Sequence, residues 1–179
     1  MTRVRLHAGA SATIRRHALT DAPREACGLL LGRTSGRAER RVLQLLQALP
    51  AINEFQTHIS NWPREGPEKT KFPEHARDRG DEEAYAIGAL AILRARKQAR
   101  TEGLELVGAY HSHVEADADF SPLDRALALD DEARPLWPRA VFLVFSLLSP
   151  AMPPNTPRWR AFTYDAATHD FRELGLQLS

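Results

Sequence analysis

The sequence contains a single cysteine, Cys27, among 179 residues. One cysteine cannot form a disulfide within the chain or build a zinc site from several thiolates. Long hydrophobic runs are also missing. The longest, residues 140–148, is too short to cross a bilayer, which takes about 20 apolar residues. The N-terminal residues lack the apolar core of a signal peptide. We therefore expect a cytoplasmic protein with no membrane segment.

A strong charge of one sign is likewise absent. The 24 basic and 23 acidic residues give a formal net charge of +1, and no basic stretch is interleaved with aromatic residues. This balance gives no reason to expect nucleic acid or an anionic membrane as a partner. The length suits one domain, and no change in composition marks a linker. We expect residues 1–179 to form a single domain.

Hydrophobic periodicity predicts a mixture of strands and helices without strict alternation. The segment 40–49 suits either a strand or a helix, and residues 158–164 and 170–178 resemble a hairpin. The other strands are expected over 4–6, 27–32, 104–113 and 140–148, and the helices over 11–19, over 81–100 and from Ser121-Pro122 onward. The expected fold class is α/β, with one mixed β-sheet flanked by helices.

Residues 56–80 differ from their surroundings, because they combine prolines, glycines and many charges without apolar periodicity. Long segments of this kind inside a compact domain are uncommon and are usually functional. We interpret them as a polar insertion. Its apolar residues Trp62 and Phe72 either pack locally or contact a substrate, and the sequence does not decide between the two.

Two histidines lie at the end of the strand expected over 104–113. Side chains alternate along a strand, so His111 and His113 point to the same face and can meet one metal ion. Ser112, between them, faces the other side, where its hydroxyl can bond backbone. Neutral imidazole is a common ligand of zinc.

Ser121-Pro122-Leu123-Asp124 follows eight residues after His113. By itself this pattern indicates a helix start, with Ser121 as the cap and Asp124 completing a capping box. A carboxylate on that first turn can also reach back to the two histidines. Two histidines and one carboxylate leave a fourth position for water, as catalytic zinc sites do.

Hydrolysis at such a site needs a general base. Glu25 is the best candidate, because it is the carboxylate beside the apolar run that starts at Cys27. An isolated glutamate after a proline is more often simply exposed. Cys27 itself is better explained as a small buried residue than as a nucleophile.

These motifs together resemble the JAMM metallopeptidases, also called the JAB/MPN domain family, and especially their small bacterial members. The resemblance rests on residues 23–32 (PREACGLLLG), on 108–113 (GAYHSH) and on 121–124 (SPLD). It extends over most of the chain and implies a cytidine-deaminase-like α/β sandwich. The sequence departs from the family at Val114, where proline is common, and at Asp119-Phe120 before the serine.

The resemblance implies a role for each motif residue. His111, His113 and Asp124 would hold one Zn²⁺ per chain. Glu25 would take a proton from the attacking water and deliver it to the leaving amine, and Ser121 would donate to the developing oxyanion. A zinc nucleobase deaminase is excluded, because its His-x-Glu and Pro-Cys-x-x-Cys motifs are missing.

Substrates also come only from the resemblance. Relatives remove ubiquitin-like proteins or trim small sulfur-carrier proteins, so the implied partner has a glycine-rich C-terminal tail. The residues 56–80 are expected to form part of the channel for this tail. Two alternatives stay open: an inactive scaffold that binds a ubiquitin-like partner, and a small-molecule amidase. Whether two copies pair as a homodimer is also open.

Overall fold

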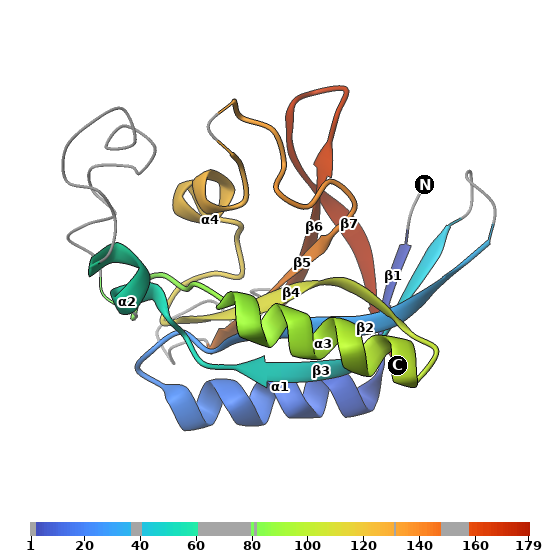
Figure 1. The fold of residues 1–179 in the computed structure, drawn as a ribbon, viewed down its shortest axis with the longest axis horizontal. Helices are drawn as coiled ribbons and strands as arrows, with labels where there is room; N and C mark the ends of the chain where they lie inside the picture. Colours follow the sequence, from blue (N-terminus) through green and yellow to red (C-terminus); the bar gives the residue numbers. More distant parts are fainter. Residues whose placement is uncertain (1–2, 37–40, 61–79, 81, 131, 148–157) are drawn as a thin grey trace.

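The computed structural model describes residues 3–36, 41–60, 80, 82–130, 132–147 and 158–179. Its strands are β1 (Arg3–Leu6), β2 (Cys27–Ser35), β3 (Val42–Ala51), β4 (Glu105–Val114), β5 (Val141–Leu147), β6 (Trp159–Asp165) and β7 (Asp170–Leu178). Its helices are α1 (Ala8–Asp21), α2 (Phe55–Ser60), α3 (Ala89–Thr101) and α4 (Pro122–Leu127). Most of these elements lie where the apolar patterns predicted them (Figure 1).

The described strands form one closed sheet in the order β1-β3-β2-β4-β5-β6-β7. The pairs β1–β3, β1–β7 and β4–β5 are parallel, and the other neighbours are antiparallel. The expected mixed sheet with helices is therefore confirmed, but it is a barrel rather than an open layer of a sandwich. Closure comes from β1, because this short strand pairs with β3 on one side and with β7 on the other.

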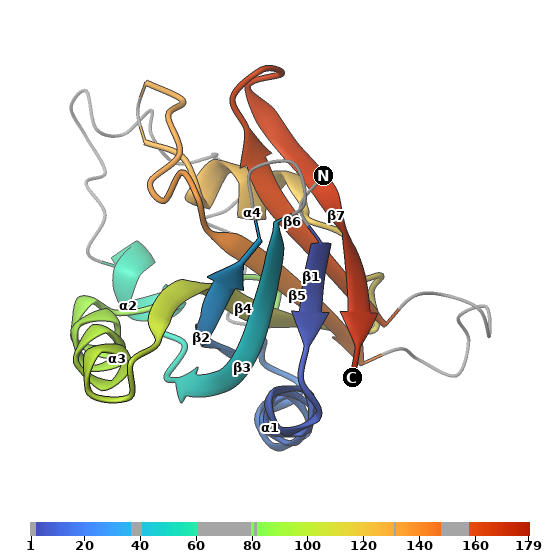
Figure 2. The ribbon, with the colours of Figure 1, turned by 90° about the vertical axis from the view of Figure 1, so that its right-hand side faces the viewer.

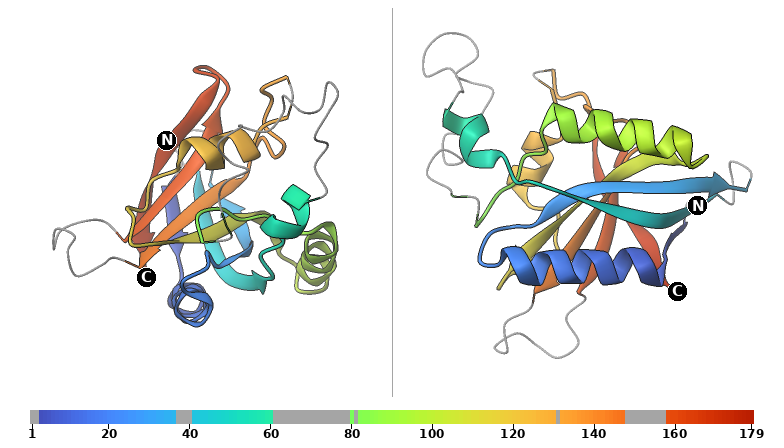
Figure 3. Two further views of the ribbon diagram at one scale, coloured as in Figure 1. Left: turned by 90° about the vertical axis from the view of Figure 1, so that its left-hand side faces the viewer. Right: turned by 60° about the horizontal axis from the view of Figure 1, so that its bottom comes forward.

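The two longer helices cover different faces of this sheet (Figures 2 and 3). Helix α1 buries Ala10, Ile14 and Ala18 in the main core, together with strand residues that point into the barrel. Helix α3 packs Ala95 and Ala99 against the outer face of β2 and β4. Among the helices of the described residues, none is long and apolar enough to span a membrane.

Three sequence expectations change in the structure. The segment 40–49 is strand β3, because it pairs with β1 and β2. The insertion expected from residue 56 begins with helix α2, and its remaining residues 61–79, with Trp62 and Phe72, lie outside the described residues. The helix expected from residue 81 begins only at Ala89.

Candidate metal centre

Strand β4 brings its two histidines to one point on the outer face of the sheet. The Nε2 atoms of His111 and His113 lie 3.1 Å apart, and both side chains are buried. Ser112 faces the opposite way, where its Oγ accepts a hydrogen bond from the Ala26 backbone N–H at 2.9 Å. The alternation expected from the sequence therefore sets the directions of all three side chains.

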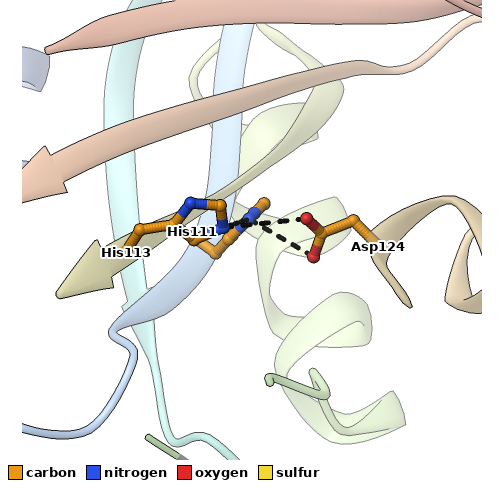
Figure 4. Close-up of side chains that lie close together, drawn as sticks. All are labelled: His111, His113 and Asp124. Atoms are coloured by element: carbon orange, nitrogen blue, oxygen red, sulfur yellow. Dashed lines mark hydrogen bonds and ion pairs between the residues drawn. The ribbon is translucent and has the colours of Figure 1, made fainter. Parts of the chain in front are cut away.

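Helix α4 supplies the third group. The Asp124 backbone N–H donates to Ser121 Oγ at 3.1 Å, and the Ser121 N–H donates to Asp124 Oδ2 at 2.8 Å, which completes a capping box. Asp124 Oδ1 lies 3.4 Å from His111 Nε2, and Oδ2 lies 3.7 Å from His113 Nε2. Figure 4 shows the carboxylate facing both rings. The capping role and the ligand geometry are therefore compatible, because the capping bonds fix the carboxylate's position.

Aromatic packing holds α4 in place against the sheet. The Phe120 ring, just before the cap, contacts the rings of Phe142, Phe162 and Phe171 at centroid distances of 5.2, 5.5 and 4.9 Å. The Arg125 guanidinium also pairs with Asp170, at the start of β7. Phe120, one of the departures from the family pattern, thus anchors the segment that carries Asp124.

Glu25 lies at the edge of the same cluster, in the loop between α1 and β2. Its side chain is 4% exposed, and its Oε1 is 3.8 Å from His113 Nε2. The Asn53 side-chain amide donates to the Glu25 carbonyl at 3.0 Å, and Ser112 holds the next residue, Ala26. Strand β4 and the segment that follows β3 therefore fix the loop that presents this carboxylate.

The spacing of the donor atoms fits a zinc ion. One ligand atom each from His111, His113 and Asp124 lies within 4.8 Å of the others, and all three residues are buried. A tetrahedral zinc ion with ligands at about 2.0–2.1 Å separates them by about 3.3 Å. The observed separations of 3.1, 3.4 and 3.7 Å bracket that value. The donor set, two imidazoles and one carboxylate, is also that of catalytic zinc sites.

The electrostatics of the cluster favour a bound cation. Burial alone would lower the pKa of His113, but Asp124 and Glu25 outweigh it and raise that pKa to about 9. Burial would raise the pKa of Asp124, yet the two imidazoles hold it below its usual value. Burial lowers the pKa of His111. The carboxylates therefore concentrate negative charge where the imidazole nitrogens converge.

Sequence reasoning missed two residues at this site. The Tyr85 ring stacks on the His111 ring, with centroids 4.4 Å apart and planes 18° apart. Asn53 accepts hydrogen bonds from the N–H groups of Phe55 and Ala86 and donates to the Ala84 carbonyl. Tyr85 fell within the expected helix from residue 81, and no motif marks Asn53.

An apolar groove leads away from the cluster. It has a volume of about 400 Å³, and Tyr85, which stacks on His111, is one of its walls. Its remaining lining comes from β2, β4, β5, α3, α4 and the segments beside them: Leu29, Ala86, Ile87, Ile92, Arg96, Ala109, Leu127, Ala128, Leu136, Trp137 and Phe142. Tyr85 therefore lies between this groove and the His111 ring.

Comparison with known proteins places the chain in context. Residues 7–162 match the family model of prokaryotic homologues of the JAB domain. A solution structure of a Desulfitobacterium hafniense protein is similar with a TM-score of 0.67 and 23% identity, covering 98% of this chain and 92% of that one. A solution structure of a Salinibacter ruber protein is similar with a TM-score of 0.55 and 20% identity, and the match covers 94% of this chain and 86% of that one. At these identities both structures support the fold alone, and no curated protein matches.

Proposed function

The chain belongs to the prokaryotic homologues of the JAB domain, and we propose that it is a zinc-dependent metallopeptidase that hydrolyses an amide bond. The observation that carries this proposal is the convergence of His111, His113 and Asp124 at zinc-ligand spacing, with Glu25 beside them. An inactive scaffold would have no need of a buried general base at this position.

The proposed mechanism divides the chemistry among the residues of the cluster. His111, His113 and Asp124 would hold a zinc ion, which acts as a Lewis acid on the carbonyl and makes water more acidic. Glu25 would take a proton from the attacking water and deliver it to the leaving nitrogen. Its burial and its fixed loop suit that task, because the carboxylate is held close to the reacting atoms.

Ser121 would stabilise the developing oxyanion. A hydroxyl has one donor proton and two lone pairs, and the capping bond from the Asp124 N–H uses only a lone pair. The proton stays available to donate to the substrate oxygen. Loss of one such donor commonly costs a few kcal/mol of transition-state stabilisation.

For the substrate we propose the C-terminal tail of a ubiquitin-like protein, most naturally a sulfur carrier. An extended segment of chain bound in the apolar groove would contact Tyr85, whose ring stacks on His111. Extended tails commonly bind beside sheets through main-chain hydrogen bonds. Glycines at the cleaved end suit a cluster in which every side chain is buried.

The first experiment is elemental analysis of the wild type and of His113→Ala, both purified without added metal. We expect about one zinc per wild-type chain and a loss in the variant. No zinc in either protein, even after zinc is supplied, would overturn the metallopeptidase proposal in favour of the scaffold.

The second experiment separates the general base from the metal. Glu25→Gln should retain zinc and lose at least about 100-fold in turnover, because general base catalysis contributes on that order. The matched control is Glu83→Gln, at an exposed glutamate. Turnover is measured by mass spectrometry on ubiquitin-like carriers with extended tails and on a panel of short amides. If only the short amides were cleaved, the proposed substrate would change from a protein tail to a small molecule.

A further inference from the structure

The two ends of the barrel differ in what covers them. At one end α1 packs into the core, and His17 Nδ1 of that helix lies 2.9 Å from the Tyr110 hydroxyl oxygen, within hydrogen-bond distance. The other end, where β4 begins, holds a cavity of about 410 Å³. We call this cavity the barrel mouth. It is lined by Thr34, Arg41, Leu43, Glu105, Leu106, Val107, Trp137, Pro138, Arg139, Val141, Thr163, Tyr164, Arg172 and Leu174.

The barrel mouth lies away from the histidine cluster. Its residues on β4 are at the start of that strand, whereas His111 and His113 are at its end. At this end of the barrel the start of β1 pairs with the start of β3 (Figure 2). His111, His113 and Asp124 are not among the lining residues of the barrel mouth, and Trp137 lines both this cavity and the apolar groove beside Tyr85.

Positive charge is concentrated around this cavity. Arg41, Arg139 and Arg172 line it, and Glu105 is the one carboxylate among the lining residues. The chain as a whole carries a net charge of only +1, so the excess is local. Guanidinium groups that gather without matching acids repel one another, and a bound anion removes that repulsion.

Two of these arginines have no acidic partner in the part of the chain that the structure describes. Within the described ranges, no carboxylate lies within ion-pair distance of Arg41 or Arg139, whereas Arg172 Nε pairs with Asp165 at 3.0 Å. The one polar contact of the Arg41 guanidinium in those ranges is with Thr34 Oγ1, at 3.5 Å. Their planar donor groups are therefore available to an oxyanion.

The floor of the barrel mouth differs from its rim. Leu43, Val107, Val141 and Leu174 belong to the main core and form an apolar base. The rings of Trp137 and Tyr164 also line the cavity. Its volume lies in the range of small-molecule sites, about 300–1,000 Å³. The combination suits a small organic molecule with an apolar or ring portion inside and an anionic group at the arginines.

We propose that the barrel mouth binds a small organic phosphate through Arg41, Arg139 and Arg172. Guanidinium groups bind phosphate oxygens in pairs through parallel hydrogen bonds. Phosphate is favoured over a carboxylate because its charge of about −2 better matches three guanidinium groups. This site is independent of the proposed peptidase activity, and it does not require the metal.

Isothermal titration calorimetry of the full chain, dialysed against chelator, tests the site with inorganic pyrophosphate as the probe. Arg139→Gln and Arg41→Gln should each weaken binding at least about tenfold, since each removes charge-assisted hydrogen bonds. Arg16→Gln, at an exposed arginine of α1, is the matched control and should match the wild type. Glu105→Gln should bind about threefold more tightly, because it removes the opposing charge.

Arg139 is exposed in the loop before β5, so its replacement leaves the fold intact even if Arg41→Gln is destabilised. Equal affinities in Arg139→Gln and Arg16→Gln would overturn the proposal. So would loss of binding in His113→Ala, which would move the anion to the histidine cluster. Citrate binding as tightly as pyrophosphate would overturn the assignment to phosphate.

Discussion

His113 illustrates how single hydrogen bonds set the chemistry of this site. Its Nδ1 lies 2.6 Å from the Asp117 carbonyl oxygen, which can only accept, so Nδ1 carries a proton. Nε2 then faces Asp124 and Glu25 with either a proton or a lone pair. The two carboxylates that hold the pKa of His113 near 9 are therefore placed to hold a cation instead. Metal binding at Nε2 would release the proton from Nε2, and the proton on Nδ1 would stay.

Cys27 provides a prediction at the same scale. Its thiol is buried, and burial together with the charge of Glu25 raises the pKa of Cys27 to about 12. The reactive thiolate should be about a thousandfold scarcer than in an unfolded chain at the same pH. We expect iodoacetamide at pH 8.5 to alkylate the native protein at least about a thousandfold more slowly than the protein in guanidinium, as measured by intact mass.

The chain contains one cysteine, so the whole mass shift reports on Cys27. Equal alkylation rates in the native and denatured protein would contradict the burial of this thiol. They would also reopen a nucleophilic role for it, which the sequence disfavoured and the structure disfavours further.

Residue patterns predicted the directions of side chains better than their partners. Alternation along one strand was enough to place His111 and His113 together and Ser112 behind them. The stacking of Tyr85 on His111 joins two segments 26 positions apart in the sequence, and no local pattern records such a contact. Trp62 and Phe72 lie outside the described residues, so their suggested substrate contact stays a prediction.

At the scale of elements, β4 and β5 approach each other closely at Gly108. These strands are parallel, and Gly108 pairs with Val141. A Cβ atom at position 108 would lie 1.9 Å from the Val141 carbonyl oxygen, which the strand geometry cannot accommodate without a shift. The glycine therefore allows the pairing that carries His111 and His113.

We predict that Gly108→Ala lowers the free energy of unfolding by about 3 kcal/mol, the upper range for an overpacked core. For a chain of this size the melting temperature should fall by about 6–12 °C. The control is Gly175→Ala in β7, where an added Cβ meets no atom within 4 Å. Circular dichroism would follow the thermal unfolding of both variants. Equal melting temperatures for Gly108→Ala and Gly175→Ala would contradict the prediction.

The helix expected from residue 81 shows why element boundaries are hard to predict. The acids at positions 82 and 83 favour a helix start, as the macrodipole predicts. In the structure Asn53 binds the backbone of Ala84 and Ala86, and Ile87 pairs with Asn53 in a β-bridge. These tertiary bonds keep the segment extended until Gly88, which places Tyr85 beside His111.

At the scale of the molecule, the closed sheet was the feature that sequence patterns could not give. Of the strands that the structure describes, they predicted all but β3, including the short β1, and they predicted the mixed α/β class. The segment 40–49, which contains most of β3, was left open between a strand and a helix. Closure depends on which strands lie beside β1, and pairing partners distant in sequence leave no periodic signal. The match over residues 7–162 confirms the family resemblance, but the sandwich that the resemblance implied did not predict the closure of the sheet.

The proposed metal site joins two separate elements of the molecule. His111 and His113 belong to the barrel, whereas Asp124 belongs to α4, a helix of six residues. A ligand that binds only the folded state stabilises it, by about 2.7 kcal/mol at 100 times its dissociation constant. We predict that zinc at that excess raises the melting temperature of the chelator-treated protein by about 5–10 °C.

The decisive variant is Asp124→Asn, because the amide oxygen can still accept the capping bond from the Ser121 N–H while the carboxylate charge is lost. Its own stability should change little, and its response to zinc should fall to a small fraction of the wild-type shift. Glu25→Gln, which keeps all three ligands, should respond like the wild type. A full zinc shift in Asp124→Asn would mean that α4 does not contribute to the metal site, and the ligand assignment would then have to be revised.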